Sequence, residues 1–248
     1  MNITTLSIGD ELLYGEVVDT NASCLGGRLY AAGLKVQRHL TVGDNEPDIM
    51  EAIEALAGKS DAVIVTGGLG PTVDDITARA VAKLTGRRLI LNNEALSHLH
   101  RYYAKQGGEM HPSNEKQALL PAKSTLIPNP LGTACGFALI HKGCFFFFLP
   151  GVPCEMKRMF DDTVIRFLME HKKNNEVVMT KVLKVFGLAE VDAGALLHAV
   201  IPPDSGITTA FCVNFPEVHV KFRAEGDQPQ EAADRLAITS EMAKRKLR

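Results

Sequence analysis

The chain lacks a strong net charge, a long apolar segment, any C-x-x-C pair of cysteines, and histidines at H-x-x-x-H spacing. Its 248 residues carry a formal net charge of -2, which argues against nucleic-acid binding through bulk positive charge. No apolar run is long enough to cross a bilayer, and the first residues predict a strand rather than a basic, apolar signal peptide. We therefore expect a cytoplasmic protein that does not bind membranes.

The five cysteines are widely spaced and include no C-x-x-C pair, so neither a disulfide framework nor a zinc site is indicated. We expect reduced, mostly buried thiols. Cys154 lies at an expected helix start, where a thiolate could be stabilised, but no histidine lies in a recognisable partner motif. The eight histidines show neither H-x-x-x-H nor H-E-x-x-H spacing. Any metal would therefore have oxygen ligands, which favour a hard cation such as magnesium or manganese.

Strand and helix signals alternate along the first two thirds of the chain. Strands are expected at residues 3–8, 35–42, 62–65, 124–127, 136–140 and 144–149. Helices are expected at residues 21–32, 47–57, 92–106, 113–119 and 154–171, and directly after residue 75. This alternation predicts an α/β domain with a mostly parallel sheet and helices on both faces.

The pattern changes after a polar stretch at 171–176, the best candidate for a linker. A strand, a helix, two strands and a final helix follow, at 177–186, 190–199, 208–213, 217–224 and from Pro229. This order predicts a small α+β domain at 177–248 after a larger domain at 1–172. The smaller domain has no G-x-x-G loop and no aromatic stacking motif, so we expect no nucleic-acid partner.

The most informative segment is Gly67-Gly68-Leu69-Gly70-Pro71-Thr72-Val73-Asp74-Asp75-Ile76-Thr77. It lies between an expected buried strand and an expected helix. A glycine-rich strand-to-helix turn gathers backbone N–H groups and a positive helix end, which suits phosphate. The two carboxylates would repel phosphate unless a cation lay between them. The segment therefore predicts a metal-assisted phosphate or pyrophosphate site.

Other acidic residues follow neighbouring strands, and ligands of α/β sheets bind beyond the carboxyl ends of strands. Asp10 follows the first expected strand and Asp44 the second. Asp44 and Asp75 are the pair that we expect to hold a divalent cation, while Asp10 either contributes or binds a ligand hydroxyl. Adjacent helical residues point about 100° apart, so we expect only one of Asp74 and Asp75 to face the site.

Each of these carboxylates also has a structural interpretation. Thr72 and Asp75 approximate a capping box, with Thr72 as the N-cap and Asp75 returning to its N–H, although capping leaves the glycine cluster unexplained. Asp10 and Asp44 could be loop carboxylates that local N–H groups satisfy.

Two further turns, at 129–134 and 149–153, flank expected strands. Gly132 and Gly151 permit close backbone approach to a ligand, or they simply form ordinary turns. The helix that opens near Gly151 would present N–H donors, with Lys157 one turn in.

Together these motifs resemble the amino-terminal part of the competence/damage-inducible protein A (CinA) family. The similarity spans roughly residues 1 to 170, and that part looks like the molybdopterin-binding (MoaB/MogA-like) domain. Five motifs occur in order, at residues 9–12, 19–21, 67–77, 129–136 and 149–157. Residues 177–248 resemble the small middle domain of the family.

The resemblance implies a doubly wound α/β fold, a homodimer, and hydrolysis of ADP-ribose to AMP and ribose 5-phosphate. The implied cofactors are a divalent metal (cobalt, magnesium, manganese or nickel) and potassium. Asp44 and Asp75 match acidic metal-site positions, and Gly67, Gly68 and Gly70 match the phosphate loop. The remaining candidates for nucleotide binding in the matching motifs are Asn21, Thr72, Thr77, Asn114, Gln117, Gly132, Thr133, Gly151 and Lys157.

Two features depart from the family. Cys135 stands where the family motif usually has proline, which puts the rigidity of that loop in question. The sequence ends at Arg248, where longer members continue into a nicotinamide-mononucleotide deamidase domain, so we expect that activity to be absent.

Three functions are compatible with the sequence. The leading hypothesis is metal-dependent hydrolysis of the pyrophosphate in an ADP-ribose-like nucleotide, with N–H groups of residues 67–70 stabilising charge and Asp10 or Asp74 orienting water or acting as base. The second is binding of molybdopterin, or adenylyl transfer to it, in cofactor biosynthesis. The third is a non-catalytic nucleotide-binding module.

Overall fold

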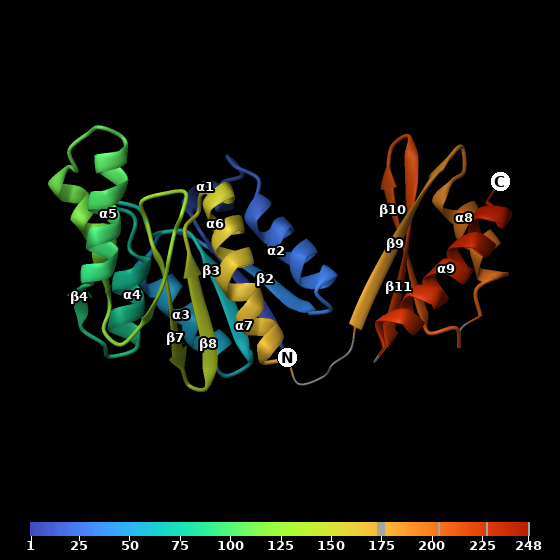
Figure 1. Ribbon diagram of the computed structural model, residues 1–248, viewed down its shortest axis with the longest axis horizontal. Coiled ribbons are helices and arrows are strands. Elements are labelled where there is room, and N and C mark those ends of the chain that lie inside the picture. The colour runs from blue at the N-terminus through green and yellow to red at the C-terminus, as the bar shows by residue number, and fades with distance from the viewer. Residues whose placement is uncertain (173–176, 203, 227, 248) are drawn as a thin grey trace. The chain divides into compact units, whose positions relative to one another are not determined.

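The computed structural model describes residues 1–172, 177–202, 204–226 and 228–247, which belong to two units. One unit comprises residues 1–29 and 34–172, and the other comprises residues 30–33 and 173–248. Figure 1 labels the elements of both units. Most of the expected linker, residues 173–176, lies outside the described residues.

A six-stranded sheet with the order β2-β1-β3-β8-β7-β6 forms the centre of the larger unit. β1 (Ile3–Ile8), β2 (Val36–Val42), β3 (Ala62–Thr66) and β8 (Cys144–Leu149) are parallel. β7 (Gly136–His141) pairs antiparallel with both β8 and β6 (Thr125–Ile127). The prediction of a mostly parallel sheet is confirmed. Every residue of β1 and β3 is buried, as expected for strands covered on both faces.

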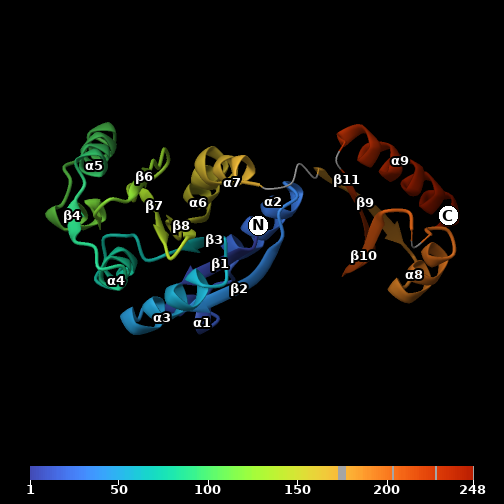
Figure 2. The same cartoon turned by 90° about the horizontal axis from the view of Figure 1, so that it is seen from below.

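Helices cover the two faces of this sheet (Figure 2). α2 (Thr20–Ala31), α6 (Pro153–Met159) and α7 (Ile165–Glu170) lie on one face, and α3 (Glu46–Ala57) and α4 (Thr77–Leu84) lie on the other. Leu6 and Ile8 of β1 belong to the same buried apolar cluster as Ile49 and Ile53 of α3. The expected helix at 154–171 forms, but a π-helical segment, η2 (Phe160–Val164), joins α6 to α7.

Three short elements of the larger unit were not predicted. They are α1 (Asp10–Leu13), β4 (Leu89–Leu91) and β5 (Leu119–Pro121), and the last two pair antiparallel as a ribbon. Elements of three or four residues carry little apolar periodicity, so they are easily missed in a sequence. Between β4 and β5 lie α5 (Asn93–Lys105), which forms as expected, and η1 (Pro112–Ala118). η1 is a 3-10 helix at the place where a short helix was expected.

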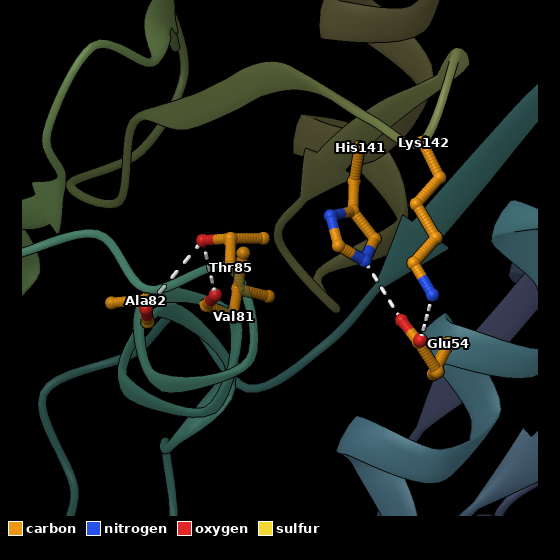
Figure 3. A network of polar contacts seen from close by, with 6 residues as sticks. All are labelled: Glu54, Val81, Ala82, Thr85, His141 and Lys142. Carbon is orange, nitrogen blue, oxygen red and sulfur yellow. Dashed lines mark hydrogen bonds and ion pairs between the residues drawn. The ribbon is translucent and has the colours of Figure 1, made fainter.

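Polar contacts fix the turn between β7 and β8, which lies at the amino end of β8 (Figure 3). Glu54 of α3 accepts a hydrogen bond from His141 Nε2 at 2.8 Å and another from Lys142 Nζ. The Lys142 hydrogen bond holds the pKa of Glu54 below its ordinary value. Nearby, Thr85 closes the end of α4 by donating its hydroxyl to the Val81 carbonyl at 2.7 Å.

The smaller unit is built on an antiparallel sheet with the order β10-β11-β9. Its strands are β9 (Val177–Phe186), β10 (Ile207–Asn214) and β11 (Glu217–Gly226), and its helices are α8 (Glu190–His198) and α9 (Pro229–Lys246). Val220 and Phe222 of β11 pack in one buried cluster with Leu236 of α9. The predicted α+β order is confirmed. No described helix is both long enough and apolar enough to cross a membrane.

Candidate functional site

Five loops of the larger unit meet at one edge of the sheet. The parallel strands β1, β2, β3 and β8 end at this edge, and the antiparallel β7 begins there. A cavity of about 360 Å³, the central cavity, opens between the loops. Its polar side chains belong to Glu11, Asp44, Asp74, Asp75, Gln117, Thr133 and Glu155. The expected convergence of acidic loops therefore occurs.

Many of the predicted site residues line the central cavity. They are Asp44, Gly67, Gly68, Gly70, Asp74, Asp75, Gln117, Thr133 and Gly151. Asp10 does not line the cavity but contacts Asp44, and Asn21 lines an adjoining hollow of about 100 Å³. The predicted residues that line neither space are Thr72, Thr77, Asn114, Gly132 and Lys157.

Asp10 and Asp44 bind each other's backbone. Asp10 N–H donates to Asp44 Oδ2 at 3.0 Å, and Asp44 N–H donates to Asp10 Oδ1 at 3.1 Å. Burial raises the pKa of Asp44; the Asp10 hydrogen bond opposes this, while repulsion from Asp10, Glu11 and Asp74 adds to it. Both carboxylates thus accept hydrogen bonds from backbone N–H groups of the neighbouring loop, as the structural interpretation expected. The two carboxylates also concentrate negative charge, which a cation would offset.

The glycine loop passes very close to the end of β1. Gly67 has φ +105°, and a Cβ at this position would lie 2.1 Å from the Ile8 carbonyl oxygen. Gly68 has φ +67°, and its Cβ would lie 2.1 Å from Thr77 Oγ1. Thr77 is fully buried and donates its hydroxyl to the Gly67 carbonyl at 3.1 Å. Thr77 therefore anchors the loop from below rather than lining the cavity.

The capping-box interpretation is wrong about the helix start but right about the contact that Asp75 makes. α4 begins at Thr77 with Ile76 as its N-cap, so Thr72 is not the N-cap of this helix. Asp75 Oδ2 accepts the Thr72 N–H at 2.9 Å, as that interpretation expected, and also the Thr72 hydroxyl at 2.5 Å, which closes the turn before α4.

The expectation that only one of the two adjacent aspartates faces the site is also wrong. Asp74 and Asp75 both precede the helix, so the angular spacing of helical residues does not apply, and both line the cavity. A hydrogen bond with Thr72 lowers the pKa of Asp74.

Asn129 organises the loop before β7 and links it to α6. Its buried side chain accepts the Leu131 N–H at 3.0 Å and the Gly132 N–H at 2.9 Å. Its Nδ2 donates to the Ala134 carbonyl at 2.9 Å and to Glu155 Oε2 at 2.7 Å. Glu155 thus lines the central cavity from the α6 side. Glu155 was not among the predicted site residues, because a sequence motif does not reveal the direction of a side chain.

The side-chain oxygens at this site are of the kind that binds hard cations. Within the described ranges, however, no group of three or more histidine, cysteine, aspartate or glutamate residues is arranged to hold a metal. Magnesium is commonly held by one or two protein carboxylates together with phosphate oxygens of the substrate. Asp44 and Asp75 both line the cavity, and their role as metal ligands stays a prediction.

The five cysteines are free, but they are not mostly buried as predicted. Cys135 and Cys144 are buried, and burial raises the pKa of their thiols to about 11 and about 12. Cys24 is half-buried, whereas Cys154 and Cys212 are exposed. Cys154 lies in the first turn of α6, where exposure is common because such a turn borders a loop.

Comparisons with known proteins agree with this architecture. Residues 4–170 match the family model described as "Probable molybdopterin binding domain", and residues 180–248 match "Damage-inducible protein CinA KH domain". A crystal structure of the protein CinA, with unknown function, from Thermoplasma acidophilum is 35% identical; its TM-score is 0.61 and the match covers 66% of this chain and 95% of that one. The chain belongs to the CinA family.

Two further relatives within the CinA family are longer than this chain. A "CinA-like protein" of Geotalea uraniireducens is 59% identical over 247 residues, which cover 100% of this chain and 59% of the relative. A "CinA-like protein" of Geobacter sulfurreducens is 54% identical over 96% of this chain and 57% of its own length. The chain thus spans well under two thirds of these relatives. Its KH-type domain lacks a G-x-x-G sequence, and the expectation of no nucleic-acid partner stays a prediction.

Proposed function

We propose that this chain hydrolyses the pyrophosphate bond of ADP-ribose, or of a related nucleotide, to AMP and ribose 5-phosphate. The observation that carries the proposal is the central cavity, where a glycine loop ahead of α4 faces several carboxylates. A loop of this kind suits phosphate, and the carboxylates require a cation if phosphate is to enter. Resemblance to the CinA family supplies the choice of ADP-ribose.

Asp44 and Asp75 would hold the divalent cation, which neutralises pyrophosphate charge and favours deprotonation of water. Cobalt, magnesium, manganese and nickel are the candidates, with potassium as a further ion. Backbone N–H groups of residues 68–70 would face charge that develops on the phosphate oxygens.

The attacking water needs a carboxylate that orients it. The oxygen of the water bonds to one phosphorus and its proton passes to that carboxylate, while the bridging P–O bond breaks and the bridging oxygen leaves with the other phosphate. Asp74 is exposed to solvent and Asp10 is turned toward the Asp44 amide, so neither is favoured for this role. Glu155 is held by Asn129 and lines the cavity, so we assign the orientation of water to Glu155.

A second function, binding of molybdopterin or its adenylylated form, is favoured by one specific observation. The family model that covers residues 4–170 is described as a molybdopterin-binding domain. A pterin bound to the purified protein would support this function, whereas a nucleotide bound without turnover would support a non-catalytic module.

A substrate panel with varied metals tests the leading proposal. ADP-ribose should yield AMP and ribose 5-phosphate, resolved by ion-exchange chromatography, with at least one of the four metals. Asp75→Asn and Glu155→Gln should each lower kcat by about 100-fold or more, in line with losses of single catalytic groups. Glu54→Gln, at the opposite edge of the sheet, is the matched control and should retain full activity.

The hydrolase proposal fails if no metal supports turnover and Asp75→Asn binds ADP-ribose as tightly as the parent. The homodimer implied by the family is a separate proposal, and light scattering in solution tests it.

A further inference from the structure

Three adjoining spaces lie along the carboxyl edge of the sheet. The hollow of about 100 Å³ that Asn21 lines, here the Asn21 hollow, shares Gly67 and Gly151 with the central cavity. On the other side, a hollow of about 230 Å³, here the Gln117 hollow, shares Gly70 and Gln117 with the central cavity. The two outer hollows share no lining residue, so the central cavity lies between them.

Each outer hollow has a buried amide side chain with an unmet hydrogen-bonding atom. Asn21 and Gln117 are only 8% and 6% exposed. Asn21 Nδ2 donates to the Gly151 carbonyl at 2.7 Å, and Gln117 Nε2 donates to Thr133 Oγ1 at 3.0 Å. Among the described residues, the buried side-chain oxygens without a partner are Asn21 Oδ1 and Gln117 Oε1.

An unpartnered acceptor of this kind is unfavourable in a buried position, and a donor on a ligand would satisfy it. Exchanging the oxygen and nitrogen of either amide would leave its nitrogen unpaired instead, so the need for a ligand group does not depend on that assignment. Both unmet atoms belong to residues that line the same edge, one on each side of the central cavity.

The two outer hollows differ in size and polarity. The Gln117 hollow is the larger, and apolar side chains dominate its wall, contributed by Leu69, Ile76, Leu89, Leu119 and Leu120, with Asp75, Arg79 and Lys116 also lining it. Such walls suit the faces of a planar base, whose edge could then hydrogen-bond to the amide. The Asn21 hollow is smaller, and besides apolar residues such as Leu12 and Val17 it is lined by the polar side chains of Glu11, Asp19 and Thr66, a larger polar share than in the Gln117 hollow. Its acceptors suit the hydroxyl donors of a pentose.

We propose that the site takes a two-ended pyrophosphate, with a planar base against Gln117 and an unsubstituted pentose against Asn21. This inference rests on the proposed function, because it places the pyrophosphate in the central cavity. It adds how the protein distinguishes the two ends of the ligand: the Gln117 amide hydrogen-bonds to the edge of the base, and the Asn21 amide hydrogen-bonds to the sugar hydroxyls.

Binding of the two half-products to the unmodified protein tests the proposal directly. AMP and ribose 5-phosphate, titrated by calorimetry with magnesium present, should bind together, and saturation with one should change the Kd of the other less than twofold. Mutual exclusion of the two half-products, or binding of neither, would overturn the proposal.

Two matched variants assign the ends. Gln117→Leu should weaken AMP about tenfold and ribose 5-phosphate less than twofold, and Asn21→Leu should do the reverse, since each loses one hydrogen bond to a ligand. Equal weakening of both ligands by both variants would overturn the assignment. Thermal unfolding checks that each variant folds, and if one does not, the competition experiment on the parent decides.

The outcomes separate this inference from the proposed hydrolysis. Independent binding of both half-products without turnover of ADP-ribose would contradict hydrolysis and leave the two-ended site standing. Turnover accompanied by mutual exclusion of the half-products would contradict the two-ended site alone.

Discussion

Replacing Gly67 with alanine should destabilise the larger unit, because the glycine loop lies against the end of β1. A Cβ at this position would lie 2.1 Å from the Ile8 carbonyl oxygen, well inside ordinary contact distance. Ile8 is the last residue of a fully buried strand that pairs with β2, so its carbonyl cannot move freely. The loop would have to shift, together with its hydrogen bond from Gly67 N–H to the Leu149 carbonyl.

The expected cost has two parts. Placing a non-glycine residue at φ +105° costs about 1–3 kcal/mol. Displacing the loop also weakens the Gly67 hydrogen bonds to Leu149 and Thr77, at about 1 kcal/mol for each bond lost. We expect a total of about 2–4 kcal/mol, which lowers the thermal midpoint by roughly 5–15 °C for a domain of this size.

Differential scanning calorimetry of the parent, Gly67→Ala and Gly15→Ala measures this effect. Gly15 also has a positive φ, +74°, but a Cβ there would have no neighbour within 4 Å. Gly15→Ala therefore reports the backbone conformation without the steric clash, and it should cost about 1 kcal/mol or slightly more. Gly67→Ala should also lower ADP-ribose turnover, since Gly67 lines the central cavity and Gly15 does not.

A specific result would refute this reasoning. If Gly67→Ala and Gly15→Ala unfold within about 1 °C of each other, the loop does not press on the Ile8 carbonyl, and the close approach is not what requires glycine.

Three further predictions concern the same unit. Asp44→Asn should raise the thermal midpoint at pH 7 while lowering turnover. Folding raises the pKa of Asp44 above 3.8, so the folded protein binds more protons than the unfolded chain. The charged Asp44 carboxylate therefore destabilises the folded protein only as the pH rises through the shifted pKa range. Equal thermal midpoints of the parent and Asp44→Asn at pH 7, or a higher midpoint of the variant that persists below about pH 4, would contradict this. Asn129→Ala should lower the free energy of unfolding in urea by about 2–4 kcal/mol, because the buried Asn129 amide makes four hydrogen bonds. The control variant Asn92→Ala, which removes the N-cap of α5, should lower it by about 1 kcal/mol. Similar losses for the two variants would contradict this prediction. Cys135 and Cys144 should resist a disulfide reagent at pH 8 until denaturant is added, since burial keeps their pKa values at about 11 and about 12; fast reaction of all five thiols in native protein would disprove it.

Much of the fold could be predicted because long elements carry their pattern locally. β3 and β8 contain continuous apolar runs, and both form where expected. The amphipathic α3 and α5 begin within a residue or two of the predicted starts. The β4–β5 ribbon could not be predicted in this way, because its three-residue strands pair across the whole of α5 and η1. That ribbon nevertheless contributes Leu89 and Leu119 to the wall of the Gln117 hollow.

The candidate site divides in a similar way. Asp44, Asp75 and the glycines of residues 67–70 were predicted, because polar loops after parallel strands must meet at one sheet edge. Glu155 was missed, since its place in the cavity depends on a hydrogen bond from Asn129, a residue 26 positions earlier. The roles assigned to these residues stay predictions, and the proposed assays test them.

By itself, the sequence determined that strands alternate with helices, that acidic and glycine-rich loops share one edge, and that a smaller α+β unit follows. Those conclusions need only local periodicity and the rule that parallel strands end together. Only the tertiary structure decided that α4 begins at Thr77, which leaves both Asp74 and Asp75 at the cavity. It also placed Asn21 and Gln117 on either side of that cavity with one unmet oxygen each. Burial and the direction of a side chain depend on contacts between distant segments, which sequence spacing does not encode.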